Sequence, residues 1–431
     1  MRERNYTRLG EIVWTEKLAN GLQIFVVTKP EFAKTYAFFA VKYGGMDMRF
    51  EEDGQWRDTP AGVAHFLEHK MFDTEDGNAL QVLAANGAQP NAFTGSDMTA
   101  YYFDSTENFE ENLRTLLSFV SVPWFTRESV DKEQGIIGQE IRMGEDDPSL
   151  RCYYDMLEAL YDHLPVRTSV AGTVESIADI TADTLYACHR TFYQPANMCL
   201  CVVGDVDPNL VRRAAEEILP RQSGRADIPR DYGEPEEPRA VTPRRERRME
   251  VSMPLFMVGW KCDAPLEGPE SLRQELIHDL AYELLMGESS PLYTRLYEQG
   301  LVNKNFGGGW DRVHGGACFY AGGESRDPDA VRDAIAEEAQ RIGREGLDEA
   351  FFQRTQRALY GSRLRRLNSF DSVCIELATA YFYGSDYYTF AECYDAITKE
   401  DAEQCIRTCF TPERTALAVV LPLEDSDSGE E

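Results

Sequence analysis

Two histidines and a glutamate lie close together in the segment GVAHFLEHKMF, residues 62–72. The apolar residues between them predict an amphipathic helix, on which His65 and His69 lie one turn apart with their Cβ atoms about 6 Å from each other. Imidazole nitrogens at that spacing can bind one zinc ion at about 2.0–2.1 Å. Glu68 lies beside this face, where its carboxylate can take a proton from a water on the metal without binding the metal itself.

A histidine on a helix is more often solvated or part of the core than a metal ligand. That alternative has to be weighed against the whole pattern. Because the chain has only six histidines, the arrangement H-x-x-E-H would arise by chance in roughly one such chain in a hundred. The arrangement therefore favours a metal site with Glu68 as its general base.

A catalytic zinc site with two histidines needs a third protein ligand, for which a carboxylate is expected. The segment 129–147 predicts a helix, and Glu133 and Glu140 lie two turns apart on one face of it. Solvation is the alternative for both, because the chain has 74 acidic residues and helical carboxylates are usually exposed. Either glutamate is a candidate ligand.

The composition describes a globular protein with an acidic surface. Its 431 residues are 43% hydrophobic and 27% charged, which allows two or three domains. The formal net charge of −30 argues against nucleic acid and anionic membranes as partners. The opening residues MRERNYTRLGEIVW lack the apolar core of a signal peptide, and no apolar run approaches the roughly 20 residues that span a bilayer.

The ten cysteines are scattered and form no C-x-x-C pair. The closest are Cys199 with Cys201 and Cys405 with Cys409. This spacing suits buried thiols in a reducing compartment better than a disulfide framework or a thiolate zinc site. We therefore expect a cytoplasmic protein.

The chain carries an internal repeat at a constant offset of 217 residues. Residues 180–203 align with 397–420, sharing among others an Ile-Thr start, a Cys-x-Arg-Thr and a Val-Val end. The same offset aligns 38–44 with 255–261. One offset that serves two distant segments indicates a tandem duplication of about half the chain, far longer than a solenoid repeat.

Each copy opens with strand patterns such as LQIFVV (22–27) and continues with amphipathic helices such as 107–125 and 328–346. The fold class is therefore α+β, with two similar sandwich domains of helices and a mixed, largely antiparallel sheet. The expected organisation is an N-terminal zinc-binding domain (1–222), a Pro- and charge-rich linker (223–245), a similar metal-free domain (246–423) and a disordered acidic tail (424–431).

The chain resembles the pitrilysin/insulinase family of zinc metallopeptidases, which includes the mitochondrial processing peptidases. The branch most like it is bacterial, with one pair of repeats that close as a clamshell. The resemblance covers nearly the whole chain, but it is carried by four segments: PAGVAHFLEHKMF (60–72), GAQPNAFTGSDMTAYYF (87–103), KEQGIIGQEI (132–141) and FYQPANMCLCVVGD (192–205). H-x-x-E-H is the inverted zinc-peptidase signature.

The resemblance implies roles for individual residues. His65, His69 and Glu140 match the zinc ligands, and Glu68 matches the general base. Glu133 matches the first glutamate of the downstream pair, which supports the ligands without binding the metal itself. The family's edge strand for substrate matches Asn91, Ala92 and Phe93, whose backbone would pair with an extended peptide.

The second copy lacks these groups. At the offset of 217, His65, Glu68, His69 and Glu140 correspond to Tyr282, Leu285, Met286 and Arg357. One zinc ion per chain is therefore expected.

The family's C-terminal domain often supplies an arginine and a tyrosine, seven residues apart, that help to hold substrate. Tyr297 and Asn303 stand at those positions here, and Arg295 is near but out of register. This departure suggests a dimer, either with a second copy or with a metal-free homologous chain that provides the missing pair.

The resemblance thus implies a zinc-dependent endopeptidase or oligopeptidase that encloses extended peptides in a chamber between two domain pairs and hydrolyses them there. Two other functions stay open: a non-catalytic subunit of an assembly on the same fold, and a protein that assists modification and rarely cuts peptides. A purely structural descendant would have no reason to keep all five groups of the site.

Overall fold

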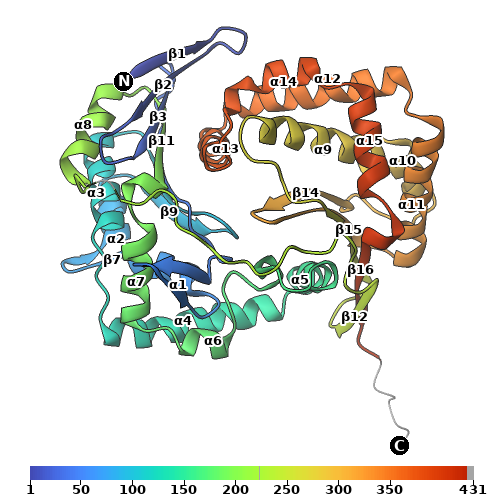
Figure 1. Cartoon of the computed structure of the whole chain (residues 1–431), viewed down its shortest axis with the longest axis horizontal. Coiled ribbons are helices and arrows are strands. Elements are labelled where there is room, and N and C mark those ends of the chain that lie inside the picture. Colours follow the sequence, from blue (N-terminus) through green and yellow to red (C-terminus); the bar gives the residue numbers. More distant parts are fainter. Residues whose placement is uncertain (223, 425–431) are drawn as a thin grey trace, which may run out of the picture. The chain divides into compact units, whose positions relative to one another are not determined.

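The computed structural model describes residues 1–222 and 224–424. The disorder expected for the acidic tail therefore lies outside the described residues from position 425 onward. The chain forms two compact units (Figure 1). Unit 1 contains Met1–Ile141, Thr168–Tyr232 and Ser362–Ala391, and unit 2 contains Arg142–Arg167, Gly233–Gly361 and the chain from Glu392 onward. Each unit combines helices with an open sheet, which confirms the predicted α+β class.

The sheet of unit 1 has seven strands in the order β1-β2-β3-β11-β4-β10-β9. β11 is parallel to β3, and all the other pairs are antiparallel. The sheet is therefore mixed and largely antiparallel, with β9 at one edge. The strands are β1 (Arg2–Tyr6), β2 (Glu11–Lys17), β3 (Gln23–Thr28), β4 (Thr35–Val41), β9 (Gln89–Thr94), β10 (Thr99–Ser105) and β11 (Met198–Gly204).

The centre of this sheet is covered on both faces. Strand β4 is buried along its whole length and therefore reads as a continuous apolar run rather than an alternation. Its residues Ala37, Phe39 and Val41 join the main core of unit 1, while helix α13 contacts β4 and β11. The helices of unit 1 are α1 (Val63–Met71), α2 (Ala79–Ala85), α3 (Phe109–Ser121), α4 (Arg127–Glu145, as far as Ile141), α6 (Val174–Ala178), α7 (Ala182–Phe192), α8 (Pro208–Ile218) and α13 (Phe370–Phe382).

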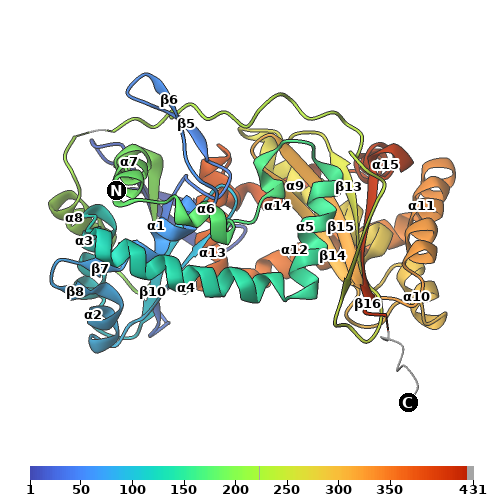
Figure 2. The same cartoon turned by 90° about the horizontal axis from the view of Figure 1, so that it is seen from below.

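The sheet of unit 2 has five strands in the order β12-β16-β13-β15-β14. Helix α5 (Pro148–Leu160) contacts β12, β13 and β16, and Figure 2 shows it beside the sheet to which they belong. The strands are β12 (Arg244–Met249), β13 (Leu255–Cys262), β14 (Gly307–Val313), β15 (Gly316–Glu324) and β16 (Thr415–Pro422). The other helices are α9 (Glu270–Met286), α10 (Pro291–Glu298), α11 (Pro328–Glu345), α12 (Glu349–Arg366, as far as Gly361), α14 (Phe390–Ala396, from Glu392) and α15 (Lys399–Cys409).

The two units repeat one plan. Adding 217 to the bounds of α7 gives those of α15, and the same shift takes β9, β10, β4 and β11 onto β14, β15, β13 and β16 within a few residues. The N-caps agree as well, because the Thr181 and Thr398 hydroxyls both accept a backbone N–H in the first turn of their helices. Unit 1 adds β1 and β2 to the shared five strands.

The units are not contiguous in sequence. Helix α5 follows the first copy's α4 yet packs on the sheet of unit 2, and α13, which lies near the position 217 residues after α5, packs on the sheet of unit 1. The two copies thus exchange equivalent helices. The predicted boundaries 1–222 and 246–423 do not include this exchange, because sequence periodicity shows which face of a helix is apolar but not which sheet the helix covers.

The predicted linker is tied down at both ends. Strand β12 begins within the run of residues 223–248, and Phe50 bridges to Arg230 in unit 1. In unit 2 the Glu236 side chain is only 6% exposed.

Two short hairpins complete unit 1: β5 (Arg49–Glu52) with β6 (Gln55–Asp58), and β7 (Asp73–Thr74) with β8 (Gly77–Asn78).

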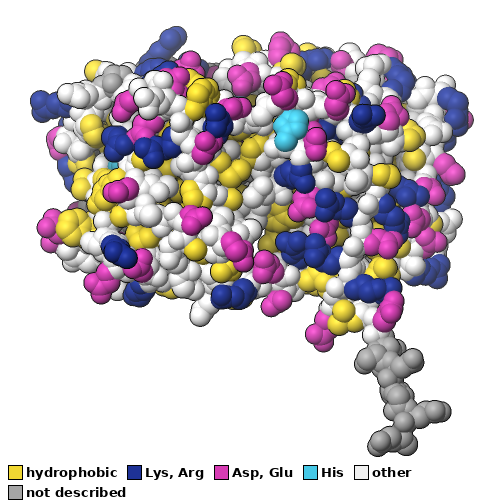
Figure 3. All heavy atoms as spheres, turned by 60° about the horizontal axis from the view of Figure 1, so that its bottom comes forward, with side chains coloured by type: hydrophobic (Ala, Val, Ile, Leu, Met, Phe, Trp, Pro, Cys, Tyr) yellow, Lys and Arg dark blue, Asp and Glu magenta, His cyan; other side chains and the backbone are white. Residues whose placement is uncertain are grey.

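The surface mixes charges of both signs. On the face drawn in Figure 3, acidic side chains are interspersed with lysines and arginines despite the net charge of −30. Within the described ranges, no helix is both long and apolar enough to cross a membrane.

Candidate functional site

Helix α1 carries the first part of the site. Its apolar side chains, among them Phe66, Leu67 and Met71, are fully buried in the core of unit 1 and fix the rotation of the helix. Gly62 precedes it with φ of 91°, and a Cβ there would lie 2.5 Å from the Ala171 carbonyl oxygen. Only glycine fits this turn without strain, so the start of the helix is sharply set.

His65, His69 and Glu140 converge, although Glu140 comes from α4. The His65 Nε2 atom lies 3.5 Å from Glu140 Oε1, and His69 Nε2 lies 3.6 Å from Glu140 Oε2. One ligand atom from each residue lies within 4.8 Å of the others. Ligands about 2.05 Å from a tetrahedral ion are separated by about 3.3 Å, so this donor set fits a zinc ion.

Glu133, which lies on the same face of α4 as Glu140, contacts the ring of His69 on the side away from Glu140. Its Oε1 atom lies 3.1 Å from His69 Nδ1. A proton on Nδ1 that is donated to this carboxylate leaves the Nε2 lone pair free toward Glu140 and His65. Burial acts to lower the pKa of His69, but the hydrogen bond to Glu133 and the charges of the nearby carboxylates outweigh it and raise the pKa.

His65 has a different environment from His69. Its side chain is 12% exposed. Burial, together with the nearby imidazole of His69, lowers the pKa of His65 to about 4. The ring is therefore neutral at physiological pH, which is the form that binds a metal.

Glu68 is buried next to these ligands, with only 7% of its surface exposed. Burial raises the pKa of its carboxyl group, and the hydrogen bond from Thr94 opposes that rise. The Thr94 hydroxyl donates to Glu68 Oε2 at 2.6 Å, and it comes from the edge strand β9. A carboxylate that burial makes more basic suits proton transfer.

Thr94 is a site residue that the sequence reasoning missed. It directly follows the predicted substrate segment, Asn91, Ala92 and Phe93, and it ends the same strand. Alternation along a strand places its side chain on the same face as Ala92. The signal in the sequence was a hydroxyl residue directly after the predicted substrate segment. Threonine is too common in strands for this signal to stand out.

Strand β9 is the edge that the resemblance required. Asn91, Ala92 and Phe93 pair with Tyr102, Tyr101 and Ala100 of β10, and among the described strands β9 has no partner on its other side. Helix α1 contacts this strand. The segment predicted to bind substrate therefore lies beside the three converging ligands, within one unit.

Unit 2 has none of these groups at the corresponding positions. Tyr282, Leu285 and Met286 are buried on α9, and Arg357 lies on α12. Of the residues near the expected arginine and tyrosine, Tyr297 is 53% exposed and Asn303 donates to Glu324 Oε2 at 2.9 Å. Arg295 forms an ion pair with Glu338 at 3.3 Å.

Comparison with known families identifies both halves of the chain. The model described as insulinase, peptidase family M16, matches residues 53–174, which contain all the converging groups. The model described as the peptidase M16 inactive domain matches residues 179–359.

Individual relatives agree with the family models. A protein of Bacillus subtilis (strain 168), described as the uncharacterized zinc protease YmfH, is 38% identical over 97% of this chain and 98% of its own. The solved structure of an M16-like peptidase from Alicyclobacillus acidocaldarius has a TM-score of 0.92 at 33% identity and covers 96% of this chain and 99% of its own. A protease from Helicobacter pylori shares the fold, with a TM-score of 0.80 at 19% identity over 95% of this chain and 99% of its own. The predicted resemblance is confirmed, and the chain belongs to the insulinase (M16) family of peptidases.

Proposed function

We propose that this protein is a zinc-dependent endopeptidase or oligopeptidase that hydrolyses extended peptides at the site in unit 1. The observation that carries this proposal is the convergence of His65, His69 and Glu140 with a buried carboxylate, Glu68, beside them. The names of the relatives support a zinc protease. The cytoplasm stays the expected location.

The donor set assigns a role to each ligand. His65 and His69 would hold the ion through Nε2 and Glu140 through its carboxylate, while Glu133 fixes the His69 ring. A zinc ion held there supplies a Lewis acid for a peptide carbonyl and lowers the pKa of water. A closed structural site would have four protein ligands, whereas three leave a position open for chemistry.

Glu68 would act as the general base. Its carboxylate takes the proton of the attacking water and passes it to the leaving amine. The Thr94 hydroxyl donates to Oε2, which leaves Oε1 as the oxygen that would take the proton. Burial keeps the carboxylate basic enough for this transfer.

Substrate would pair with the free edge of β9. An extended peptide can add to such an edge through backbone hydrogen bonds, which read shape more than sequence. Asn91, Ala92 and Phe93 would supply those backbone groups. Because Thr94 at the end of the same strand contacts Glu68, a peptide on this edge would run past the base.

We also propose a dimer, either of two copies or with a metal-free homologous chain. Tyr297 and Asn303 stand where the family's substrate-holding arginine and tyrosine are expected, and Arg295 is engaged by Glu338. A partner chain could supply the pair. Light scattering would give the mass, and an isolated monomer with full peptidase activity would refute the need for a partner.

The central experiment separates the base from the ligands. Glu68→Gln should keep zinc and lose kcat/KM by about 10²–10⁴-fold on a panel of unstructured peptides, because only the proton acceptor is removed. Glu140→Ala should lose zinc as well as activity. Glu145→Gln, an exposed change on the same helix as Glu140, is the control. Full activity of Glu68→Gln, or undiminished zinc in Glu140→Ala by elemental analysis, would refute the proposal.

A further inference from the structure

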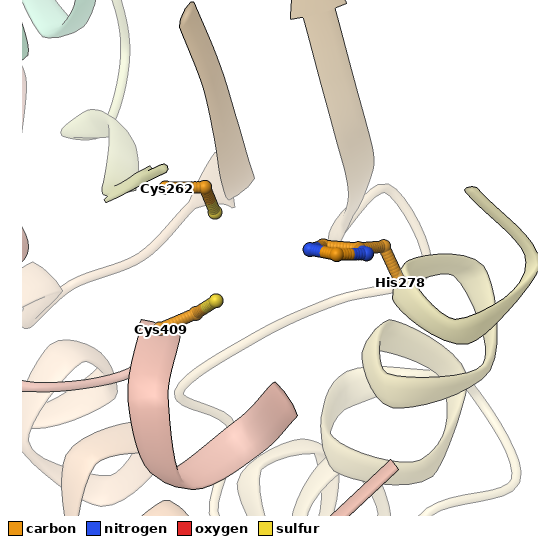
Figure 4. Close-up of side chains that lie close together, drawn as sticks. All are labelled: Cys262, His278 and Cys409. Carbon is orange, nitrogen blue, oxygen red and sulfur yellow. The ribbon is translucent and has the colours of Figure 1, made fainter. Parts of the chain in front are cut away.

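Unit 2 contains a second convergence of possible metal ligands, made of residues other than those that correspond to the first site at the offset of 217. Cys262 ends β13, His278 lies in the middle of α9 and Cys409 ends α15. One ligand atom from each lies within 4.8 Å of the others, and all three residues are buried. Figure 4 shows the two sulfur atoms and the imidazole ring pointing toward one another.

The imidazole of His278 is already oriented as a ligand would be. Its Nδ1 atom lies 2.7 Å from the Gln274 carbonyl oxygen, which can only accept, so Nδ1 carries the proton. The lone pair is then on Nε2. Phe319 stacks on the ring with centroids 5.3 Å apart, and Trp310 packs against it at 4.5 Å. A hydrogen bond on one ring nitrogen that frees the other is the usual support of a metal-binding histidine.

A third thiol lies next to the first two. Cys405 precedes Cys409 by one helical turn on α15, and the two sulfur groups are close enough to share a hydrogen bond. It is buried like the others. The Cys405 sulfur does not belong to the set of ligand atoms that all lie within 4.8 Å of one another. Because cysteines at i and i+4 lie on one face of a helix, the Cys405 side chain would have to turn toward the ion to join it.

Burial of thiols for packing alone would explain cysteines at these positions, because free cysteine behaves as a small hydrophobic residue. It explains the imidazole less well. With Nδ1 bound to the Gln274 carbonyl oxygen, the Nε2 side of His278 faces the sulfurs, where the Cys409 thiol is its hydrogen-bond partner. A thiolate and imidazole set of this kind favours zinc over magnesium, calcium and manganese.

We propose that Cys262, His278 and Cys409 bind a zinc ion in unit 2, with Cys405 as the fourth ligand. Four protein ligands of the type Cys₃His form a closed tetrahedral site, which is structural rather than catalytic. The ion would tie the end of strand β13 to helices α9 and α15. At the offset of 217 the four ligands correspond to Gly45, Ala61, Phe192 and Cys188, so unit 1 cannot form the same site.

Metal content tests this proposal independently of peptidase activity. Protein purified under reducing conditions should hold two zinc ions per chain, and His65→Ala/Glu140→Ala should retain one. Adding Cys409→Ser to that double variant should remove the remaining ion. Cys152→Ser is the matched control, because Cys152 is a buried thiol of unit 2 whose sulfur instead lies 3.5 Å from the Ala418 carbonyl oxygen. It should leave the metal content unchanged.

Cobalt substitution covers the case in which Cys409→Ser fails to fold. The double variant His65→Ala/Glu140→Ala, loaded with Co²⁺, should show intense thiolate-to-cobalt charge-transfer absorption in the near ultraviolet. Cys405→Ser should weaken zinc binding at least tenfold in competition with a chelator. A metal-free double variant, or a cobalt spectrum without thiolate bands, would overturn the site; an unchanged affinity of Cys405→Ser would remove Cys405 from it.

Discussion

The strongest stability prediction concerns Glu236, whose side chain is almost fully buried in unit 2. Its carboxylate accepts a hydrogen bond from the Lys261 ammonium at 2.6 Å and hydrogen bonds from the backbone N–H groups of Asp162, His163 and Leu164 at 2.8–3.1 Å. The Lys261 side chain is only 2% exposed and lies over the Tyr161 ring at 5.0 Å. The pair therefore holds the predicted linker against β13 and the end of α5.

Replacing Glu236 by glutamine keeps an oxygen acceptor for the backbone N–H groups but removes the negative charge. Among the described residues, the Lys261 ammonium then keeps the Arg239 carbonyl oxygen, at 3.4 Å, as an acceptor for its buried charge. Removing one member of a buried ion pair costs about 3–5 kcal/mol. We expect a loss of that size in the free energy of unfolding of unit 2.

Urea unfolding, followed by tryptophan fluorescence and by hydrogen exchange of peptides from β13, measures this loss. With a slope of about 3 kcal/mol/M, the midpoint for unit 2 should fall by about 1–2 M. Glu237→Gln, an exposed neighbour, should leave it unchanged. If Glu236→Gln unfolds within about 0.3 M of the natural protein, the ion pair does not stabilise the unit and the reasoning is refuted.

Three further predictions follow from the geometry. Burial raises the pKa of Glu236, but Lys261 and the three backbone N–H groups outweigh burial and lower the pKa to about 2. The Glu236 carboxylate therefore stabilises unit 2 fully above pH about 4.5, the pKa of an unperturbed glutamate, and this stabilisation is lost as the pH falls toward 2. Acid unfolding of unit 2, compared between the natural protein and Glu236→Gln, would detect the loss. Thr94→Val should lower kcat/KM by about tenfold or more with unchanged zinc, because a hydrogen bond to a charged group contributes about 1.5–3 kcal/mol; equal kcat/KM would show that Thr94 does not position Glu68. Glu133→Gln should weaken zinc binding by about 10–100-fold, since it leaves the His69 ring less firmly held; unchanged affinity in chelator competition would contradict this role.

Much of the architecture was readable from the sequence. The amphipathic pattern around His65 and the strand pattern in 22–27 correspond to α1 and β3, and the 217-residue offset corresponds to elements with matching bounds. These features are local or periodic, so they leave a signature in consecutive residues. The convergence of Glu140 with two histidines 70 or more residues earlier came from the resemblance, since composition alone left Glu133 equally eligible.

Contacts between segments that are distant in the chain could not be predicted from the sequence. Thr94 reaches Glu68 across a helix–strand contact, and Cys262, His278 and Cys409 meet only because β13, α9 and α15 pack together. The scattered cysteines indicated ordinary buried thiols. No spacing rule for zinc ligands covers residues that are brought together by tertiary structure rather than by one turn of chain.

The exchange of α5 and α13 bears on how the chain can fold as it leaves the ribosome. All seven strands of the unit 1 sheet have been synthesised once Gly204 emerges, yet the helix that covers β4 and β11 ends only at Phe382. Until then the outer face of β4, with Phe38 and Ala40, is exposed apolar surface of the kind that aggregates or recruits chaperones. A fragment cut after residue 222 would keep that face uncovered permanently, whereas a chain that includes α13 can bury it once Phe382 has been synthesised.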